Sequence, residues 1–465
     1  KAKSTIPAAR LGDVPAFGRE LAFTDLPADV VAQARRCVLD LAGTAAGGSR
    51  TDAARIANHY ATTQLRSSDG EARLLFDGRR ASAAGAAFAG AATIDSLDAH
   101  DGHVLTKGHA GVAVLPALLA FIDSGARCDD REFITCIVLG YEIATRAGIA
   151  LHATVPDFHC SGAWNALAGA AIGARLLGFD REQTRQAMGI AEYWGPRGQI
   201  MRVCDSPSMV KDGSSWGAHA GVSAALLAGA GFTGAPALTL ERNDAASFWS
   251  DLGTRWRIRE QYFKAYPVCR WAQPAIEAAL ALKRKGNFEA DDIAEIAIDS
   301  FAESVALGAG CAVPITTDEA QYSLPYPVAA ALVCGQVGAA EVGQPMLAEP
   351  RVRRLLSVMK LTEDPEFSRR FPAERWSRVR ITLRNGRVLL SEPAVARGNP
   401  ENPLTDDEIR SKYRALAEPV LGSERSTRIE DAVDGLGYGA QGAQGARGAA
   451  TCLPLLEELL SAGHG

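Results

Sequence analysis

The chain has 465 residues, a formal net charge of −5 at pH 7, and 47% hydrophobic against 22% charged residues. This length exceeds the size at which one hydrophobic core keeps growing, so we expect a globular protein of two domains. The mildly acidic balance gives no reason to expect nucleic acid or an anionic membrane as a partner. The sequence has no uncharged apolar run of transmembrane length and no signal-like N-terminus, so the expected location is cytoplasmic.

Nine cysteines are scattered along the chain, and none forms a CxxC pair. This pattern indicates neither a disulfide framework nor a structural zinc site. We expect most of these thiols to behave as small buried hydrophobic groups.

The first 265 residues are predicted to be helical. In the stretch 27–42 the apolar residues from Val30 to Leu41 fall on one helical face, and Gly43 is expected to end that helix. Further helices are predicted over 52–63, 81–94, 131–150, 162–177, 181–191 and 217–230. Many are rich in alanine and glycine, which allows close helix–helix approach, so we expect a tightly packed bundle and no solenoid.

The pattern changes after about Pro267. Residues 293–299 alternate as a strand does, and 379–383 with 388–391 form a hairpin whose Asn385-Gly386 suits a type I′ turn. Thr405 begins a helix with a capping box, and a last helix is expected over 453–460 after a flexible linker at 435–448. The predicted fold is mainly α. A large helical domain is formed by segments 1–265 and 404–465, and a smaller α+β lid domain covers 266–403.

Titratable residues crowd into the thirteen positions from Leu97 to His109. They comprise three histidines, two aspartates and a lysine, and an almost wholly apolar stretch follows at 110–121. Burying such groups beside a core is costly unless they are paired or used, which favours a functional site over a solvated loop. A helical turn would put Asp98 and Asp101 on one face, with His100 beside Asp101 as an acid/base pair. A zinc, iron or manganese site is the competing functional interpretation, but the spacing matches no recognised ligand set.

Three more motifs carry candidate residues. His159 precedes an alanine-rich helix, whose positive end favours a neutral imidazole; the alternative is a buried histidine satisfied by hydrogen bonds. Lys211 precedes another such helix and could bind a carboxylate or exchange a proton; the alternative is a surface lysine. Lys264 and Arg270 stand at the domain junction, where they could clamp carboxylates, unless they are surface cations beside core aromatic residues.

Tyr326 opens a buried helix of the second domain, and tyrosines in such positions usually belong to the core. The sequence has no Walker A loop, no GxGxxG between a strand and a helix, and no GxSxG elbow. Chemistry without a cofactor is therefore the simplest expectation.

An ordered series of motifs spanning nearly the whole chain resembles the MmgE/PrpD family. In chain order they are Val38-Leu-Asp-Leu-Ala-Gly-Thr-Ala-Ala-Gly-Gly48, Leu97-Asp98 with Asp101 and His109, Val114-Leu-Pro, Gly140-Tyr-Glu142, Phe158-His159, Leu176-Leu-Gly-Phe-Asp180, Met209-Val-Lys211, Gly231-Phe-Thr-Gly234, Lys264 with Tyr266-Pro and Cys269, and Tyr322-Ser-Leu-Pro-Tyr326. Each motif is weak alone, but the order over this length is specific.

The resemblance implies a helical domain built from both chain ends and an α+β lid, usually in a homodimer, with the active site between the domains. Members act without metal or organic cofactor on small polycarboxylic acids: they dehydrate 2-methylcitrate, decarboxylate cis-aconitate or epimerise iminodisuccinate. The positions that match family active-site residues are Asp98, His109, His159, Lys211, Lys264 and Tyr326.

Two departures weaken the dehydratase expectation. Gln273 stands where dehydratases and decarboxylases often have a histidine, and the usual Asp-Asp-Thr-His run is replaced by His100-Asp-Gly-His103. In length and in this divergence the chain is similar to iminodisuccinate epimerase. We therefore expect epimerisation by proton abstraction and reprotonation next to a carboxylate.

The base and acid are expected among Lys211, His109, His159 and Tyr326, with Asp98 beside them. The residues expected to hold substrate are His103, Arg202, Lys264, Arg270 and Gln273. The alternatives are a 2-methylcitrate-type dehydratase and, from another class, a metal-dependent hydrolase. That hydrolase would use His100, Asp101, His103 and His109. A non-enzymatic helical binding module would not need several titratable clusters at one domain junction.

Overall fold

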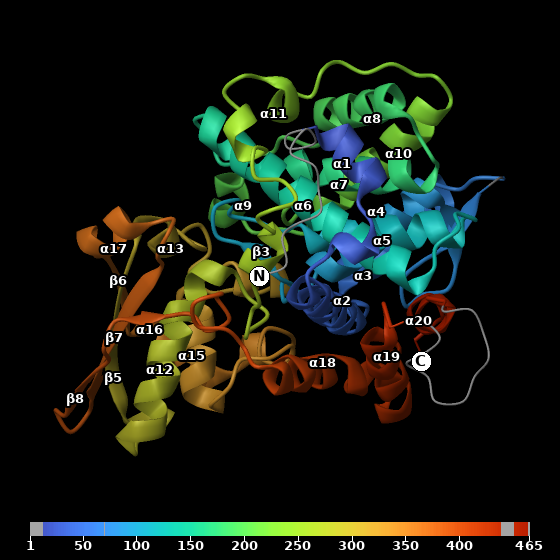
Figure 1. Ribbon diagram of the computed structural model, residues 1–465. Coiled ribbons are helices and arrows are strands. Elements are labelled where there is room, and N and C mark those ends of the chain that lie inside the picture. The colour runs from blue at the N-terminus through green and yellow to red at the C-terminus, as the bar shows by residue number, and fades with distance from the viewer. Residues whose placement is uncertain (1–12, 69, 439–450, 464–465) are drawn as a thin grey trace.

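The protein is described by a computed structural model over residues 13–68, 70–438 and 451–463. A large helical body carries a smaller α+β body at one side (Figure 1). Most of the predicted linker at 435–448 lies outside the described residues. The predicted mainly helical fold, with a helical domain from both chain ends and an α+β lid, is confirmed.

The helical domain is built largely from the first half of the chain. Its helices are α1 (Val14–Glu20), α2 (Ala28–Gly48), α3 (Asp52–Gln64), α4 (Ala83–Asp95), α5 (Gly111–Asp123), α6 (Asp130–Thr154), α7 (Gly162–Leu176), α8 (Arg181–Trp194), α9 (Met201–Asp205), α10 (Ser214–Gly229) and α11 (Leu238–Glu241). The short strands here are β1 (Glu71–Arg73), β2 (Arg80–Ser82), β3 (Gly102–His103) and β4 (Gln261–Tyr262). α5 is apolar and buried throughout most of its length, so the titratable loop leads directly into the core.

The chain returns to this domain after the lid. α18 (Asp406–Leu421), α19 (Ser423–Gly435) and α20 (Leu453–Leu459) lie at its lower edge, and α18 packs along α2 (Figure 1). Thr405 caps α18 in the predicted capping box with Glu408. α6 is long and apolar enough to cross a membrane, but the whole apolar window is buried inside the protein, as in the core helix of a globular domain.

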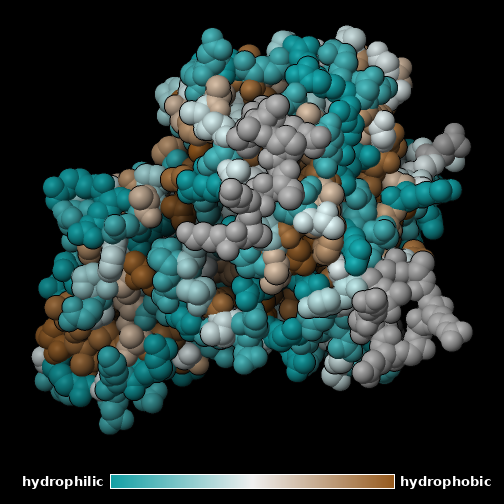
Figure 2. Space-filling model, viewed as in Figure 1, coloured by the Kyte–Doolittle hydropathy of each residue, from teal (hydrophilic) through white to brown (hydrophobic). Residues whose placement is uncertain are grey.

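The lid has its own hydrophobic core around a twisted sheet. The sheet order is β6 (Met359–Glu363), β5 (Ile293–Ser300), β7 (Trp376–Leu383) and β8 (Val388–Leu390), with β9 (Ala394–Val395) also paired to β7. β5 is parallel to β6 and antiparallel to β7. The lid helices are α12 (Gln273–Gly286), α13 (Ala302–Val305), α14 (Thr317–Gln321), α15 (Pro325–Cys334), α16 (Pro350–Ser357) and α17 (Pro365–Arg370). Apolar surface gathers on the lid at the left of Figure 2, toward the end of the sheet that carries β8, where Val388 and Leu390 are exposed.

Single turns of 3-10 helix connect several of these elements. They lie at Phe23–Asp25, Ala246–Phe248, Arg257–Glu260, Arg270–Ala272, Ala290–Asp292 and Met346–Ala348.

Two connections join the lid to the helical domain, and they run side by side. The backbone N–H of Phe263, in the outgoing connection, donates to the carbonyl of Gly398 in the returning one at 2.9 Å. A Cβ at Gly398 would lie 2.0 Å from the carbonyl oxygen of Phe263, so the close approach requires glycine there. The domains are therefore linked by two hydrogen-bonded strands of chain.

Two local predictions were wrong. α2 does not end at Gly43 but continues to Gly48. A Cβ at Gly43 would lie 3.0 Å from the ring of Tyr413 on α18, so this glycine serves close helix packing and not termination. The β7–β8 hairpin does not contain a type I′ turn, because Gly386 has a left-handed φ of 84° and Asn385 does not.

Candidate active site

The stretch from Leu97 to His109 is the irregular loop that the sequence indicates, mostly buried apart from residues near Leu105, and no helical turn puts Asp98 and Asp101 on one face. Asp98 has a φ of 55°, and β3 then pairs with β4 in the register Gly102 to Tyr262. The two aspartates consequently face different partners. Asp98 binds Lys264, whereas Asp101 accepts a hydrogen bond from the Tyr141 hydroxyl. A non-glycine residue held at positive φ marks a segment whose surroundings enforce an unfavourable conformation, as is common at functional sites.

Asp98 and Lys264 form a buried ion pair between the loop and the segment entering the lid. Their side chains are each only 1% exposed, and Lys264 Nζ lies 2.7 Å from Asp98 Oδ1. Nζ also donates to the Asp98 carbonyl at 3.0 Å. Burial alone would lower the pKa of Lys264, but the Asp98 carboxylate outweighs it and raises that pKa. Lys264 therefore remains an ammonium group.

His109 is held as a neutral imidazole. Its Nδ1 lies 2.5 Å from the carbonyl oxygen of Asp101, an acceptor, so Nδ1 carries the proton and Nε2 presents a lone pair. Burial, reinforced by the nearby Lys264 ammonium, holds the pKa of His109 well below 6.5. Its backbone N–H donates to Ser161 Oγ at 2.8 Å, which fixes the chain at this point. His109 is thus an oriented, unprotonated base at neutral pH.

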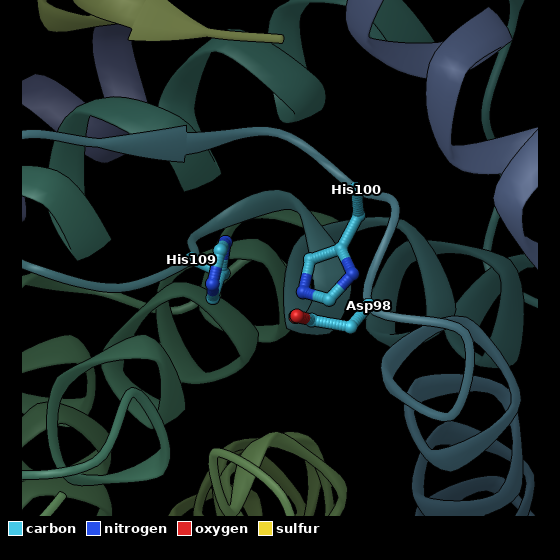
Figure 3. A group of neighbouring side chains, drawn as sticks. All are labelled: Asp98, His100 and His109. Atoms are coloured by element: carbon cyan, nitrogen blue, oxygen red, sulfur yellow. The ribbon is translucent and has the colours of Figure 1, made fainter. Parts of the chain in front are cut away.

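His100 packs beside this base. Figure 3 shows the side chains of Asp98 and His100 pointing toward that of His109, and the two imidazole centroids are 4.3 Å apart. His100 Nε2 is 3.7 Å from Asp95 Oδ1. Burial, with repulsion from Asp212 and Asp98, raises the pKa of Asp95 to about 8. The wall behind His109 therefore holds a neutral imidazole and a largely protonated carboxyl.

The metal-ligand set suggested by the sequence is not assembled. The Asp101 carboxylate is engaged by Tyr141, and His103 Nε2 lies 3.1 Å from Glu260 Oε2. Among the described residues, the group with converging ligand atoms is Asp98, His100 and His109, whose atoms lie within 4.8 Å of one another. The Lys264 ammonium on the Asp98 carboxylate repels a cation from that position.

Asp98, His109 and Lys264 line a small cavity of about 30 Å³ between the domains. The cavity is bounded by Asp98, Lys107, His109, Ile200, Cys204, Asp212, Tyr262, Lys264, Cys269, Arg270, Trp271, Tyr322 and Arg375. This volume is about that of one water molecule. Of the residues predicted from the sequence, the cavity brings together Asp98, His109, Lys264 and Arg270.

Two predicted substrate-binding residues hold the lid backbone. Arg270 donates to the Arg397 carbonyl at 2.7 Å and to Gln273 Oε1 at 2.9 Å. Gln273 Nε2 donates to the carbonyls of Tyr266 and Val268 at 3.0 and 3.1 Å. Arg270 lines the cavity, whereas Gln273 does not.

Lys211 lies at the same domain boundary but faces a different space. Its ammonium is 2.8 Å from Asp318 Oδ1 of the lid and donates to Gln321. Lys211 and Arg202 line an open groove of about 1080 Å³ on the helical domain. Lys211 has a φ of 47°, so its direction is also enforced by its surroundings.

The other predicted residues lie away from the cavity lining. His159 is half-buried, with Nδ1 3.4 Å from the Arg197 carbonyl. His103 is paired to Glu260, and Tyr326 lies in the lid core with its hydroxyl donating to the Glu341 carbonyl at 2.8 Å.

Nine of the thirteen lining residues were not among the site residues selected from the sequence, and four of these nine with ionisable side chains are Lys107, Asp212, Tyr322 and Arg375. Asp212 accepts a hydrogen bond from Ser161, and burial raises its pKa to about 6. Lys107 and Tyr322 stand inside stretches already described, and Asp212 directly follows the Met209-Val-Lys211 motif, so their neighbours were a usable signal. Nothing in the sequence around Arg375 marks it.

Gly102 is essential to the packing of the site. A Cβ there would lie 2.6 Å from Tyr262 Oη and 2.7 Å from His109 Nδ1. We expect Gly102→Ala to lower the free energy of unfolding by about 1–3 kcal/mol and to reduce activity by displacing His109. Urea unfolding and steady-state kinetics measure both. Gly435→Ala, in open space at the end of α19, is the matched control. Unchanged kinetics in Gly102→Ala would contradict this account.

A neutral imidazole beside a buried ammonium and a protonated carboxyl, at the boundary between two domains, is an arrangement suited to acid/base catalysis. Comparison with known proteins gives the family. The MmgE/PrpD N-terminal domain matches residues 15–252 and the MmgE/PrpD C-terminal domain matches residues 266–437. The chain belongs to the MmgE/PrpD family.

Curated relatives cover most of the chain at low identity. A cis-aconitate decarboxylase-like protein of Aspergillus oryzae is 26% identical over 461 residues, which is 90% of this chain and 93% of that protein. The cis-aconitate decarboxylase of Homo sapiens is 24% identical over 420 residues, 84% of each chain. The mitochondrial 2-methylcitrate dehydratase of Yarrowia lipolytica is 26% identical over 246 residues, 48% of this chain and 46% of that protein.

Proposed function

We propose that this chain is a lyase that acts on a small polycarboxylic acid by moving a proton at a carbon next to a carboxylate. The observation that carries the proposal is the neutral His109 beside the buried Lys264–Asp98 pair in the interdomain cavity. The relatives named as cis-aconitate decarboxylase and 2-methylcitrate dehydratase support the substrate class and the lyase outcome.

The proton step is assigned to His109. Its Nε2 lone pair accepts the proton, and the Asp101 carbonyl stabilises the imidazolium through Nδ1–H. Negative charge then develops on the carboxylate oxygens of the substrate, where the Lys264 ammonium stabilises it. This electrostatic help is strong because Lys264 is buried and its ammonium is held in place by Asp98 before reaction.

The lid supplies groups that stay protonated. Burial, with repulsion from Asp98, raises the pKa of Cys269 to about 12 and that of Tyr322 well above 10. Either group is therefore protonated at neutral pH and can donate a hydrogen bond to bound substrate.

The lid must open for substrate to enter. A cavity of about 30 Å³ holds one water molecule and no polycarboxylic acid. Binding sites at domain boundaries of this kind commonly close over the substrate and exclude water. We assign the closed form to the arrangement described above.

Epimerisation of iminodisuccinate is the second candidate, and Gln273 favours it. The resemblance places a histidine at this position in dehydratases and decarboxylases. Here an amide stands there, which cannot transfer a proton and is bound to the Tyr266 and Val268 carbonyls. Epimerisation expels no leaving group, so it does not need an acid at that position.

Proton NMR in D2O tests the proposal and separates its outcomes. Purified protein is incubated with cis-aconitate, 2-methylcitrate and iminodisuccinate in turn. A lyase produces a compound that has lost water or carbon dioxide. An epimerase inverts the stereocentre and introduces solvent deuterium there without loss of mass from the carbon skeleton.

The His109→Asn variant is the control for contaminating activity. Solvent exchange that persists unchanged in this variant would contradict the assignment of His109. Wild-type protein that neither converts nor exchanges any of the three acids would overturn the proposal.

A further inference from the structure

Two cations outside the predicted set face the cavity from opposite domains. Lys107 lies in the loop after β3 and has a φ of 52°, a conformation that a lysine rarely adopts. Arg375 lies in the lid, directly before β7, and is 8% exposed. Both line the 30 Å³ cavity that contains His109 and Lys264.

Neither cation has a carboxylate partner within residues 13–68, 70–438 and 451–463. Lys107 Nζ donates a hydrogen bond to the Leu105 carbonyl at 3.3 Å, and Arg375 Nη2 donates one to the Val104 carbonyl at 3.2 Å. In the same described part of the chain, Arg375 Nε is buried and has no hydrogen-bond partner. A buried cationic donor without a partner is costly, and an anion that accepted a hydrogen bond from Nε would remove that cost.

Aromatic rings position these cations without neutralising them. Lys107 Nζ lies 4.3 Å from the centroid of Phe158. The Arg375 guanidinium lies 5.8 Å from the ring of Tyr262 and 5.9 Å from that of Phe371. Phe158 and Phe371 are themselves 6.4 Å apart, so the two cation–ring pairs are adjacent. Ring faces attract a cation but leave its charge available to a ligand.

The two positive charges repel each other in the absence of a ligand. Burial, and next the Arg375 charge, lower the pKa of Lys107 to about 8, while Glu303 acts in the opposite direction. An anion placed between them would relieve this repulsion and favour the charged lysine. The arrangement is that of an anion site divided between the loop and the lid.

We propose that Lys107 and Arg375 bind a second carboxylate of the substrate, away from the carbon that exchanges its proton. The inference rests on the proposed function for its substrate class. Lys264 is already paired with Asp98 and is assigned to the carboxylate next to the reacting carbon. Lys107 and Arg375 have no carboxylate partner among the described residues and can bind another one. The planar guanidinium fork matches a carboxylate. These two residues therefore determine specificity for acids with at least two carboxylates, and they are bridged when the lid closes.

Binding measurements with two unreactive probes test the subsite. Succinate and its monoamide, succinamate, differ by one negative charge. Isothermal titration calorimetry on the full chain should show that Lys107→Met and Arg375→Met each weaken succinate binding by roughly 10- to 100-fold. Succinamate binding should change by no more than about twofold. Lys107→Arg and Arg375→Lys keep the charge and should retain most of the succinate affinity.

Controls remove cations elsewhere on the lid. Arg380→Met, on the exposed face of β7, and Lys360→Met, on β6, should leave both dissociation constants unchanged. Lys107 is half-buried in a loop, so we expect Lys107→Met to fold. The Lys107 variant therefore tests the subsite even if Arg375→Met does not fold.

Equal loss of affinity for both probes, or a wild-type protein that binds succinate no more tightly than succinamate, would overturn the subsite. This test is independent of the proposed reaction, because the probes can bind without being converted. Wild-type protein that discriminates the probes through Lys107 and Arg375 but converts no acid would retain the subsite and lose the lyase assignment.

Discussion

His109→Asn is expected to lower kcat by a factor of about 10² to 10⁴, the usual contribution of a general base. Asparagine can keep the hydrogen bond to the Asp101 carbonyl through its amide N–H, but it has no lone pair that accepts a proton at the position of Nε2. KM should change little, because the carboxylate-binding cations remain. Steady-state kinetics with the acid identified by NMR measures both constants.

The pH profile provides a second measurement of the same group. Because burial holds the pKa of His109 well below 6.5, the acid limb of kcat/KM should lie below that pH in the wild-type enzyme. The imidazole is active when neutral, so activity is present above the folded-state pKa and is lost as pH falls through it. The limb should disappear in His109→Asn.

The matched control is His59→Asn, because His59 is an exposed histidine on α3. It should leave kcat and the pH profile unchanged. A His109→Asn variant whose kcat stays within about threefold of wild type would assign the base to another residue.

Lys264→Met is expected to lower the free energy of unfolding by about 3–5 kcal/mol, because it leaves the buried Asp98 carboxylate without its partner. Turnover should fall to background, since the charge that stabilises the developing enolate is removed. Urea unfolding gives the stability, and kinetics give the activity.

The double variant Lys264→Met with Asp98→Asn separates the two effects. Removing both charges should restore much of the lost stability without restoring activity. Lys360→Met is the control, since Lys360 pairs with Glu295 at 2.9 Å on the exposed face of the sheet and should cost less than about 1 kcal/mol. Equal destabilisation by the single and double variants would mean that Asp98 does not depend on Lys264.

Sequence patterns predicted the helical domain well because its helices carry strong local signals. The apolar periodicity of α2, the capping box at Thr405 and the alternation in β5 each arise from neighbours along the chain. The end of α2 could not be predicted in the same way. Gly43 lies against Tyr413, a residue 370 positions away, and only that contact explains the glycine.

The site was predicted in part for the same reason. Asp98, His109 and Lys264 occupy family motifs, and the chain brings them to one cavity. Motifs do not fix side-chain direction, however, so Lys211 faces Asp318 and Tyr326 faces the lid core. Arg375 was missed because its partners come from the loop after β3, some 270 residues earlier in the chain.

The paired connections at Phe263 and Gly398 determine how the lid can move. Two adjacent segments of chain, hydrogen-bonded to each other, connect the lid to the helical domain. Such a connection favours a hinge rotation of the lid about an axis through Phe263 and Gly398 over sliding or free reorientation. Lys264 directly follows Phe263, so it lies next to that axis and travels little, whereas the Arg375 guanidinium is hydrogen-bonded to Val104 of the helical domain in the arrangement described. Opening therefore breaks the Arg375–Val104 hydrogen bond and moves Arg375 away from the loop that carries Lys107. On this proposal, binding of the substrate carboxylate to Lys107 and Arg375 would close the lid at the start of each catalytic cycle.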